Sequence, residues 1–333
     1  MGRERDFSLI PIIDVSELVA GGPSRRAVAE RLGKACRESG FFYVVGHGVN
    51  AALQDRLRQL SQQFFAQNLE AKLAVRMALG GRAWRGYFRV GDELTAGKPD
   101  QKEGLYFGTE LAADDPRVRA GTPLHGPNLF PAEPAGLRGA VLDYMAALTG
   151  LGHRLMAGLA LSLGLEESYF ADRLTGEPLT LFRIFNSPPP ADPDLWGVGE
   201  HTDYGLLTIL LQDEAGGLEV KSRSRWVPAP PVPGSFVCNI GDMLDRMTGG
   251  LYRSTPHRVR NPAPRDRLSF PFFLDPNFFA RVQPIDLAGR DLPPDDRDER
   301  WDGASVLAFE GSYGDYLLAK VGKVFPQLRA AVL

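Results

Sequence analysis

The sequence predicts a mainly β fold with flanking helices, and three observations lead to that fold class. Short β-rich runs recur between residues 179 and 274, and clusters of turn-forming residues separate them. The chain has 37 glycines and 26 prolines among 333 residues, a usage that favours turns. Segments with the helical spacing of apolar residues lie on either side of this run. Closely spaced short strands of this kind are typical of a β-sandwich or barrel.

The chain before this β-rich run predicts alternating strands and helices. We expect strands at 10–14 and 41–45, a helix at 27–39 that Gly40 ends, and a second helix from Asn50. Residues 80–135 are irregular apart from a strand at 104–107, and a long helix follows at 137–162. The strands expected in the β core are 179–185, 206–211, 217–220, 225–228, 235–240, 252–260 and 267–274. An exposed acidic loop at 290–301 and a final helix at 305–322 complete the prediction.

This pattern predicts two regions that form one integrated domain. The first, residues 1–135, is a mixed α/β region that covers the β core. The second, residues 136–333, contains the long helix, the β core at about 178–285 and the C-terminal helix.

Composition excludes several classes of protein. The 38 Lys and Arg against 41 Asp and Glu give a net charge of −3 without a basic stripe, so we expect no nucleic-acid partner. Two cysteines, Cys36 and Cys238, are too few for a disulfide framework or a cysteine zinc site. The charged N-terminus has no secretory signal, and charged residues interrupt the most apolar stretch, 141–165. We therefore expect a cytoplasmic protein with no membrane partner, as a monomer or weak homodimer.

His201 and Asp203 stand two positions apart, just before an apolar run. On an extended strand such residues point to the same face, so an imidazole and a carboxylate would lie side by side. His257, in a second β-rich run, is a candidate third ligand. Two imidazoles and one carboxylate form the facial triad of non-haem Fe(II) sites, which leaves positions open for oxygen and a co-substrate. The alternative is a structural ion pair between His201 and Asp203.

Arg267 and Ser269 repeat this two-residue spacing. A hairpin would place them on a strand antiparallel to the one that carries His257, facing the same interior. An arginine binds a carboxylate through two parallel hydrogen bonds, and a buried arginine without an anion is costly. The pair therefore predicts a carboxylate-binding site. The alternative is that a nearby protein carboxylate, such as Asp242 or Asp275, pairs with the arginine.

These residues and their surroundings resemble the Fe(II)/2-oxoglutarate-dependent oxygenases, in the isopenicillin N synthase-like branch. The matching positions are His201-x-Asp203, His257, Arg267-x-Ser269, the core runs 217–218, 226–228, 233–234, 239–242, 248–250 and 254–259, and the N-terminal runs 10–14, 40–42 and 46–49. The resemblance covers about residues 10–285. A His-x-Asp pair alone is a weak signal, but the whole ordered set is a specific one.

The resemblance implies a double-stranded β-helix (jelly-roll) core with helices packed outside. It implies that His201, Asp203 and His257 bind Fe(II) and are the catalytic residues. Arg267 and Ser269 would bind 2-oxoglutarate, the co-substrate used together with O2. The implied reaction is the oxidation of a small organic molecule by hydroxylation, desaturation or ring closure, with release of succinate and CO2.

Two other interpretations stay open at this point. The first is an Fe(II) oxidase of the isopenicillin N synthase type, which does not use 2-oxoglutarate. The second is a jelly-roll protein of another kind, either a non-catalytic binder or a metal isomerase of the cupin type. Succinate release coupled to oxygen uptake distinguishes the 2-oxoglutarate-dependent oxygenase from both.

The substrate is harder to predict, and one position departs from the family pattern. Many relatives carry, on the first core strand, a tyrosine that bonds the far carboxylate of 2-oxoglutarate, and Ser187 stands there. Position 199 is Gly, where plant enzymes that form ethylene from a cyclopropane amino acid carry Arg, so we do not expect that activity. The candidate substrate-contacting residues are Arg183, Tyr204, Ser187, Phe185 and Tyr106. The remaining histidines, His47, His125 and His153, are interpreted as structural.

Overall fold

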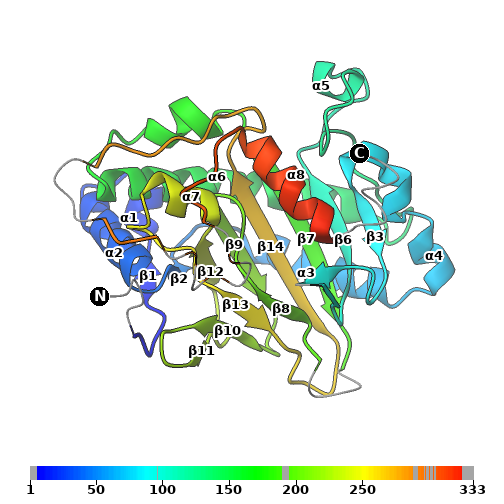
Figure 1. Ribbon diagram of the computed structural model, residues 1–333. Helices are drawn as coiled ribbons and strands as arrows, with labels where there is room; N and C mark the ends of the chain where they lie inside the picture. The colour runs from blue at the N-terminus through cyan, green and yellow to red at the C-terminus, as the bar shows by residue number, and fades with distance from the viewer. Residues whose placement is uncertain are drawn as a thin grey trace.

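Two facing β-sheets with helices outside them make up the fold (Figure 1). The computed structural model describes residues 6–95, 97–189, 195–287, 292–295, 297, 300, 303 and 305–324. Within these residues the mainly β fold class with flanking helices is confirmed.

The larger sheet has eight strands in the order β1-β2-β12-β9-β14-β7-β6-β3. Their bounds are β1 Ile12–Asp14, β2 Phe41–Val45, β3 Gly86–Phe88, β6 Glu103–Gly108, β7 Leu179–Ser187, β9 Leu207–Gln212, β12 Phe236–Ile240 and β14 Arg267–Asp275. The β1–β2 pair is parallel and the other pairs are antiparallel. Strands from the N-terminal third therefore extend the core sheet at both of its edges.

The smaller sheet has four strands in the order β11-β10-β13-β8. Their bounds are β8 Val198–His201, β10 Leu218–Lys221, β11 Trp226–Pro228 and β13 His257–Val259, and a separate hairpin joins β4 Leu94–Thr95 to β5 Lys98–Pro99. The expected strand at 252–260 is thus reduced to three residues.

The predicted hairpin between the strands of His257 and Arg267 is wrong. Strand β13 pairs with β10 and β8, whereas β14 pairs with β7 and β9 in the other sheet. Pro262 and Pro264 in the connection have no N–H group for a ladder hydrogen bond, so the chain leaves one sheet and enters the other. The Asn261 side chain holds this crossing, because its amide donates to the carbonyl oxygens of Ser187, Pro188 and Arg265.

The predicted long helix is present as α6, Leu137–Ser162, and it packs against strands β7, β9 and β14 of the larger sheet. Helices α2, Arg25–Glu38, and α3, Ala51–Phe65, pack against α6 in turn. Shorter helices are α1 Ser16–Val19, α4 Leu69–Leu73, α5 Pro116–Arg119 and α7 Asp242–Met247, with short turns of 3-10 type at Met77–Ala83 and of π type at Ala171–Thr175. Gly40 ends α2 as expected, since it has φ +67° and its N–H donates to the Ala35 carbonyl.

The C-terminal helix α8, Tyr313–Val324, begins eight residues later than the predicted residue 305. Ser312 determines this start. Its backbone N–H donates to Asp315 while its hydroxyl accepts from the Asp315 N–H, so the two residues form a capping box. Half of the acidic loop expected at 290–301 lies outside the described residues. Among the described helices, none has the length and apolar character to cross a bilayer.

Candidate active site

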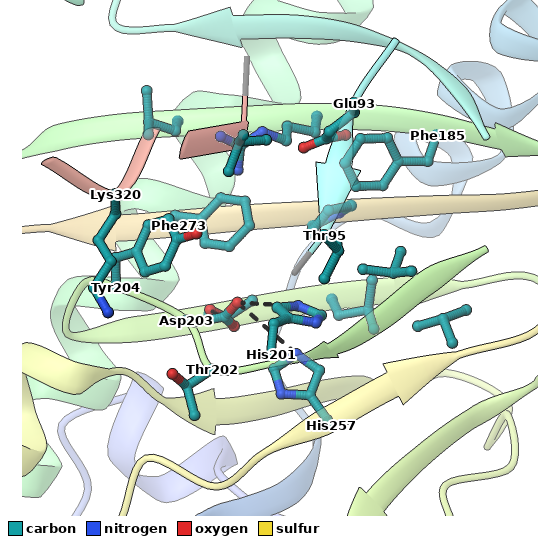
Figure 2. Close-up of a pocket in the computed structure, with 18 of the residues that line it drawn as sticks. Glu93, Thr95, Phe185, His201, Thr202, Asp203, Tyr204, His257, Phe273 and Lys320 are labelled. Carbon is teal, nitrogen blue, oxygen red and sulfur yellow. Dashed lines mark hydrogen bonds and ion pairs between the residues drawn. The ribbon is translucent and has the colours of Figure 1, made fainter. Parts of the chain in front are cut away.

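A cavity of about 450 Å³ lies between the two sheets. Strands β7, β9 and β14 contribute to one wall and β8, β10 and β13 to the other, while α8 and residues 93–97 (without residue 96) border it (Figure 2). Alternate residues of β14 face it, namely Arg267, Ser269, Pro271, Phe273 and Asp275. This is the period of two that a strand imposes.

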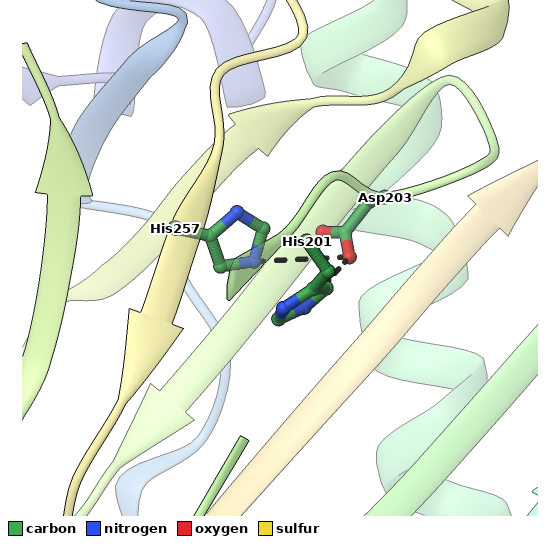
Figure 3. Close-up of side chains that lie close together, drawn as sticks. All are labelled: His201, Asp203 and His257. Carbon is green, nitrogen blue, oxygen red and sulfur yellow. Dashed lines mark ion pairs between the residues drawn. The ribbon is translucent and has the colours of Figure 1, made fainter. Parts of the chain in front are cut away.

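His201, Asp203 and His257 converge on one point of this cavity (Figure 3). The Nε2 atoms of both histidines lie 3.8 Å from Asp203 Oδ1, and one nitrogen or oxygen from each of the three residues lies within 4.8 Å of the others. His201 ends β8, and His257 begins β13 directly opposite it. Asp203 follows the strand rather than lying on it, so the turn after β8 brings the carboxylate back beside the imidazole.

The Nδ1 atoms of both histidines are occupied by backbone carbonyls. His201 Nδ1 lies 2.8 Å from the Gly199 oxygen, and His257 Nδ1 lies 3.2 Å from the Thr255 oxygen. A carbonyl oxygen only accepts, so each Nδ1 carries the proton and each Nε2 keeps a free lone pair. Both lone pairs are therefore available to a metal ion.

Asp203 is oriented by two donors on neighbouring strands. Its Oδ2 accepts from the Thr208 hydroxyl at 2.5 Å and from the Asn239 amide at 2.7 Å, which leaves Oδ1 for a metal. Burial alone would raise the pKa of Asp203, but His257, His201 and these two hydrogen bonds lower it below its usual value. Sequence reasoning missed Thr208 and Asn239, because nothing in a sequence marks which polar residues of adjacent strands meet.

The turn that carries Asp203 packs backbone to backbone against residues 241–243. The Asp242 N–H donates to the Asp203 carbonyl at 2.8 Å, and a Cβ on Gly241 would lie 2.3 Å from the Gly205 oxygen. We expect Gly241→Ala to lower the free energy of unfolding by about 1–3 kcal/mol, because the added methyl group pushes the two segments apart. It should also weaken metal binding, and thermal unfolding with a metal titration measures both effects. Gly150→Ala in α6 is the control, since nothing lies within 4 Å of its added Cβ; equal behaviour of the two variants would contradict this prediction.

Arg267 lies at one end of this cavity and keeps an unmet hydrogen-bond donor. Its Nε donates to the Gly216 carbonyl, but its buried Nη2 has no partner among the described residues. Asp242 and Asp275 do not pair with it: Asp242 accepts from Arg300 and Tyr316, and Asp275 accepts from Tyr313. The alternative that a protein carboxylate satisfies Arg267 is therefore wrong for these two residues. Burial lowers the pKa of Arg267 to about 10, so it is still a cation at pH 7.

Four of the five candidate substrate-contacting residues line the cavity: Tyr106, Arg183, Phe185 and Tyr204. Ser187 is not among the lining residues, although it stands directly opposite Arg267 in the β7–β14 register. His47, His125 and His153 also lie outside the lining.

Several lining residues were not predicted to contact the metal, the co-substrate or the substrate. They are Glu93, Thr95 and Lys102 before β6, Phe273 and Asp275 on β14, and Leu317, Lys320 and Val321 on α8. Figure 2 shows Phe273 beside Tyr204, with Lys320 next to them. Lysines on a C-terminal helix are typical of a solvent-facing surface, so the sequence carries no signal for this placement.

Comparison with known proteins gives the family of the chain. Residues 178–276 match the family model of the 2OG-Fe(II) oxygenase superfamily, and residues 10–133 match the model described as non-haem dioxygenase in morphine synthesis N-terminal. A protein named "probable iron/ascorbate oxidoreductase" from Dictyostelium discoideum is 49% identical over 97% of both chains. The chain belongs to the 2OG-Fe(II) oxygenase family.

Other relatives of this oxygenase have more specific names. A homoarginine-6-hydroxylase of Oryza sativa is 39% identical and covers 95% of this chain and 97% of its own. A 1-aminocyclopropane-1-carboxylate oxidase of Dictyostelium mucoroides is 37% identical over 97% of both chains. Among solved structures, a full-length Neurospora crassa protein in complex with alpha-KG and thymine has a TM-score of 0.78 at 26% identity, covering 97% of this chain and 99% of its own.

The oxygenase uses Fe(II) and 2-oxoglutarate, and the donor set fits both. Two free imidazole lone pairs and one ionised carboxylate oxygen suit a divalent iron ion. The unmet donor of buried Arg267 suits an anion in the same cavity. The enzyme is thus a 2-oxoglutarate-dependent dioxygenase, and O2 is the third reactant.

Acid should release the metal from this oxygenase. Both imidazoles must be neutral and Asp203 ionised to bind a cation. Burial and the neighbouring His201 lower the pKa of His257 to about 4, so His257 is neutral at pH 7 and resists protonation in mild acid. We expect the Fe(II) affinity to fall as the pH approaches about 4, where His257 takes up a proton. A metal titration at a series of pH values measures this, and an affinity that stays unchanged at pH values below about 4 would contradict it.

Proposed function

We propose that His201, Asp203 and His257 hold the iron, that Arg267 and Ser269 hold 2-oxoglutarate, and that the enzyme oxidises a small amino acid. The observation that carries the proposal is the placement of both groups in one cavity: three convergent metal-binding atoms and, on the facing sheet, a buried arginine with an unmet donor. Iron and 2-oxoglutarate, when bound, supply the activation of O2 and release succinate and CO2.

The chain's own residues would bind, orient and exclude water. Thr208 and Asn239 fix the Asp203 carboxylate, and the two backbone carbonyls fix the histidine rings. Arg267 would orient 2-oxoglutarate through its far carboxylate, with Ser269 two residues along the same wall. Phe185 and Phe273 line the cavity and limit the water that reaches the reacting atoms.

Amino acids are the first substrates to test, because two relatives are named for them. One is a homoarginine-6-hydroxylase and the other a 1-aminocyclopropane-1-carboxylate oxidase. Gly199 argues against the second chemistry as plant enzymes perform it, since those enzymes carry Arg at this position. A Cβ at position 199 would lie 3.1 Å from Thr95 Cγ2, so a long side chain there would meet Thr95.

The test is succinate formation by the iron-loaded enzyme with 2-oxoglutarate and each amino acid in turn. L-homoarginine should raise the rate several-fold above the rate without substrate and gain one oxygen atom. 1-aminocyclopropane-1-carboxylate should not raise it. Stimulation by the cyclopropane compound alone would contradict our interpretation of Gly199, and no stimulation by any amino acid would overturn the substrate proposal.

Two further points belong to the proposal. Residues 1–135 and 136–333 form one integrated domain, supported by the pairing of β2 with β12 and of β6 with β7. The oxidase that does not use 2-oxoglutarate is not favoured, since solved relatives hold alpha-KG and Arg267 keeps an unmet donor.

Four expectations from the sequence stay predictions. They are a cytoplasmic location, a monomer or weak homodimer, the absence of nucleic-acid and membrane partners, and membership of the isopenicillin N synthase-like branch.

A further inference from the structure

The cations that line the cavity differ in how they are compensated. Lys102 is buried between two carboxylates, with its Nζ 2.8 Å from Glu93 Oε2 and 2.5 Å from Asp100 Oδ2. Arg183 and Arg267, by contrast, each keep a buried N–H atom without a hydrogen-bond partner among the described residues. A buried charged donor without an acceptor is costly, so each arginine is suited to an anion from outside the chain.

Arg183 is held by aromatic rings rather than by acceptors. Its guanidinium carbon lies 4.1 Å from the Tyr106 ring centroid and 4.8 Å from that of Phe273. Ring contacts of this kind fix the plane of a guanidinium group and leave its N–H groups free. Glu93 and Asp275 act on Arg183 through their charge, but neither hydrogen-bonds to it: Glu93 accepts from Tyr106 and pairs with Lys102, and Asp275 accepts from Tyr313 at 2.6 Å.

The two arginines stand at different places along the same wall. In the β7–β14 register Ser187 lies opposite Arg267 and Phe185 opposite Ser269, so Arg183 lies beside Pro271. Pro271 is four positions after Arg267 on β14, so the two places lie roughly 13 Å apart along the strand. If Arg267 binds the far carboxylate of 2-oxoglutarate and the iron binds its other end, Arg183 is left for a second anion.

We propose that Arg183 binds a carboxylate of the organic substrate, so that the substrates of this enzyme are small carboxylic acids, amino acids included. This rests on the proposed function, because it concerns the substrate of the same cavity. It goes further in naming the residue that selects the substrate class and the chemical group it selects. Tyr106 and Phe273 are positioning residues, since they hold the guanidinium plane.

The test measures binding by calorimetry to the zinc-loaded enzyme, which cannot turn over, with and without 2-oxoglutarate. The probes are the common amino acids, L-homoarginine and 1-aminocyclopropane-1-carboxylate, each compared with its uncharged amide. At least one acid should bind the wild type, and its amide should bind roughly 30-fold or more weakly, the loss typical of an unpaired buried charge. Arg183→Met should bind acid and amide alike, and Arg183→Lys should recover part of the preference.

A matched control and the 2-oxoglutarate titration separate the outcomes. Arg173→Met removes another arginine stacked on a ring, 4.4 Å from Tyr169 and outside the cavity lining, and should keep the acid preference. No bound acid, an acid that binds no better than its amide, or an unchanged preference in Arg183→Met would overturn the proposal. Loss of 2-oxoglutarate binding in Arg183→Met would also overturn the proposal, because it would assign this arginine to the co-substrate. Failure of the wild type to bind 2-oxoglutarate would instead count against the proposed function.

Discussion

Asp203→Ala should lose tightly bound Fe(II) and, with it, 2-oxoglutarate-dependent oxygen consumption. Asp203 Oδ1 is the one anionic atom of the triad, and both histidine Nε2 atoms lie 3.8 Å from it. Removing a group that merely orients a metal ligand costs about 10–100-fold in affinity, so removing the carboxylate itself should cost more than roughly 100-fold. Metal analysis after dialysis and a titration with Fe(II) measure the loss.

Glu200→Ala is the matched control for this prediction. Glu200 is another acidic residue of the same segment, but its carboxylate pairs with Lys221 at 2.7 Å rather than with the triad. It should keep its iron and its activity. Unchanged iron content and full activity in Asp203→Ala would show that the metal lies elsewhere.

Arg267→Ala should weaken 2-oxoglutarate binding by on the order of 2–5 kcal/mol, the usual loss for one partner of a buried charge pair. Asp213 acts on the buried guanidinium through its charge, but it accepts from the Leu268 N–H, lies 3.5 Å from Arg265 and leaves Arg267 Nη2 without a hydrogen-bond partner among the described residues. Ser187, opposite Arg267, is not among the cavity-lining residues, so the far carboxylate depends heavily on the arginine. Arg267→Lys keeps the charge but loses the paired donors, and should recover only part of the affinity.

The comparison is a 2-oxoglutarate titration at equal iron content. Ser269→Ala should cost about 1 kcal/mol, the value of one ordinary hydrogen bond. Arg265→Ala is the control, since Arg265 is mostly exposed and lies 3.5 Å from Asp213. Wild-type affinity in Arg267→Ala would place the co-substrate elsewhere. A larger loss in Ser269→Ala than in Arg267→Ala would contradict the roles assigned to the two residues.

Local signals in the sequence predicted an element well where its bounds depend only on the residues within it. The long helix α6 matches its predicted bounds, because its apolar residues repeat at helical spacing over 26 residues. The start of α8 was predicted wrongly at residue 305 because the capping box at Ser312 was overlooked. The partner of β14 was wrong for another reason: strand pairing is a long-range property, and short β-rich runs do not specify their neighbours.

The same distinction applies to the site. The triad could be predicted because two of its members share one short segment and all three are residue types with few structural uses in that combination. The residues that complete the site, Thr208, Asn239 and the α8 lysine Lys320, come from elements that meet only in the folded chain. The sequence predicted Arg183 as a substrate-contacting residue. It could not show that Arg183 Nε lacks an acceptor, because hydrogen-bond partners depend on how the side chains pack around the cavity.

Oxygen uptake and succinate formation, measured together in one sample of iron-loaded wild type with 2-oxoglutarate and no added substrate, test the central claim most directly. The triad and Arg267 would act on one co-substrate in one cavity. We expect slow oxygen uptake with one succinate formed for each O2 consumed, and loss of both in Asp203→Ala and, at low 2-oxoglutarate, in Arg267→Ala. Oxygen uptake without succinate, or succinate formation that survives in Asp203→Ala, would contradict it.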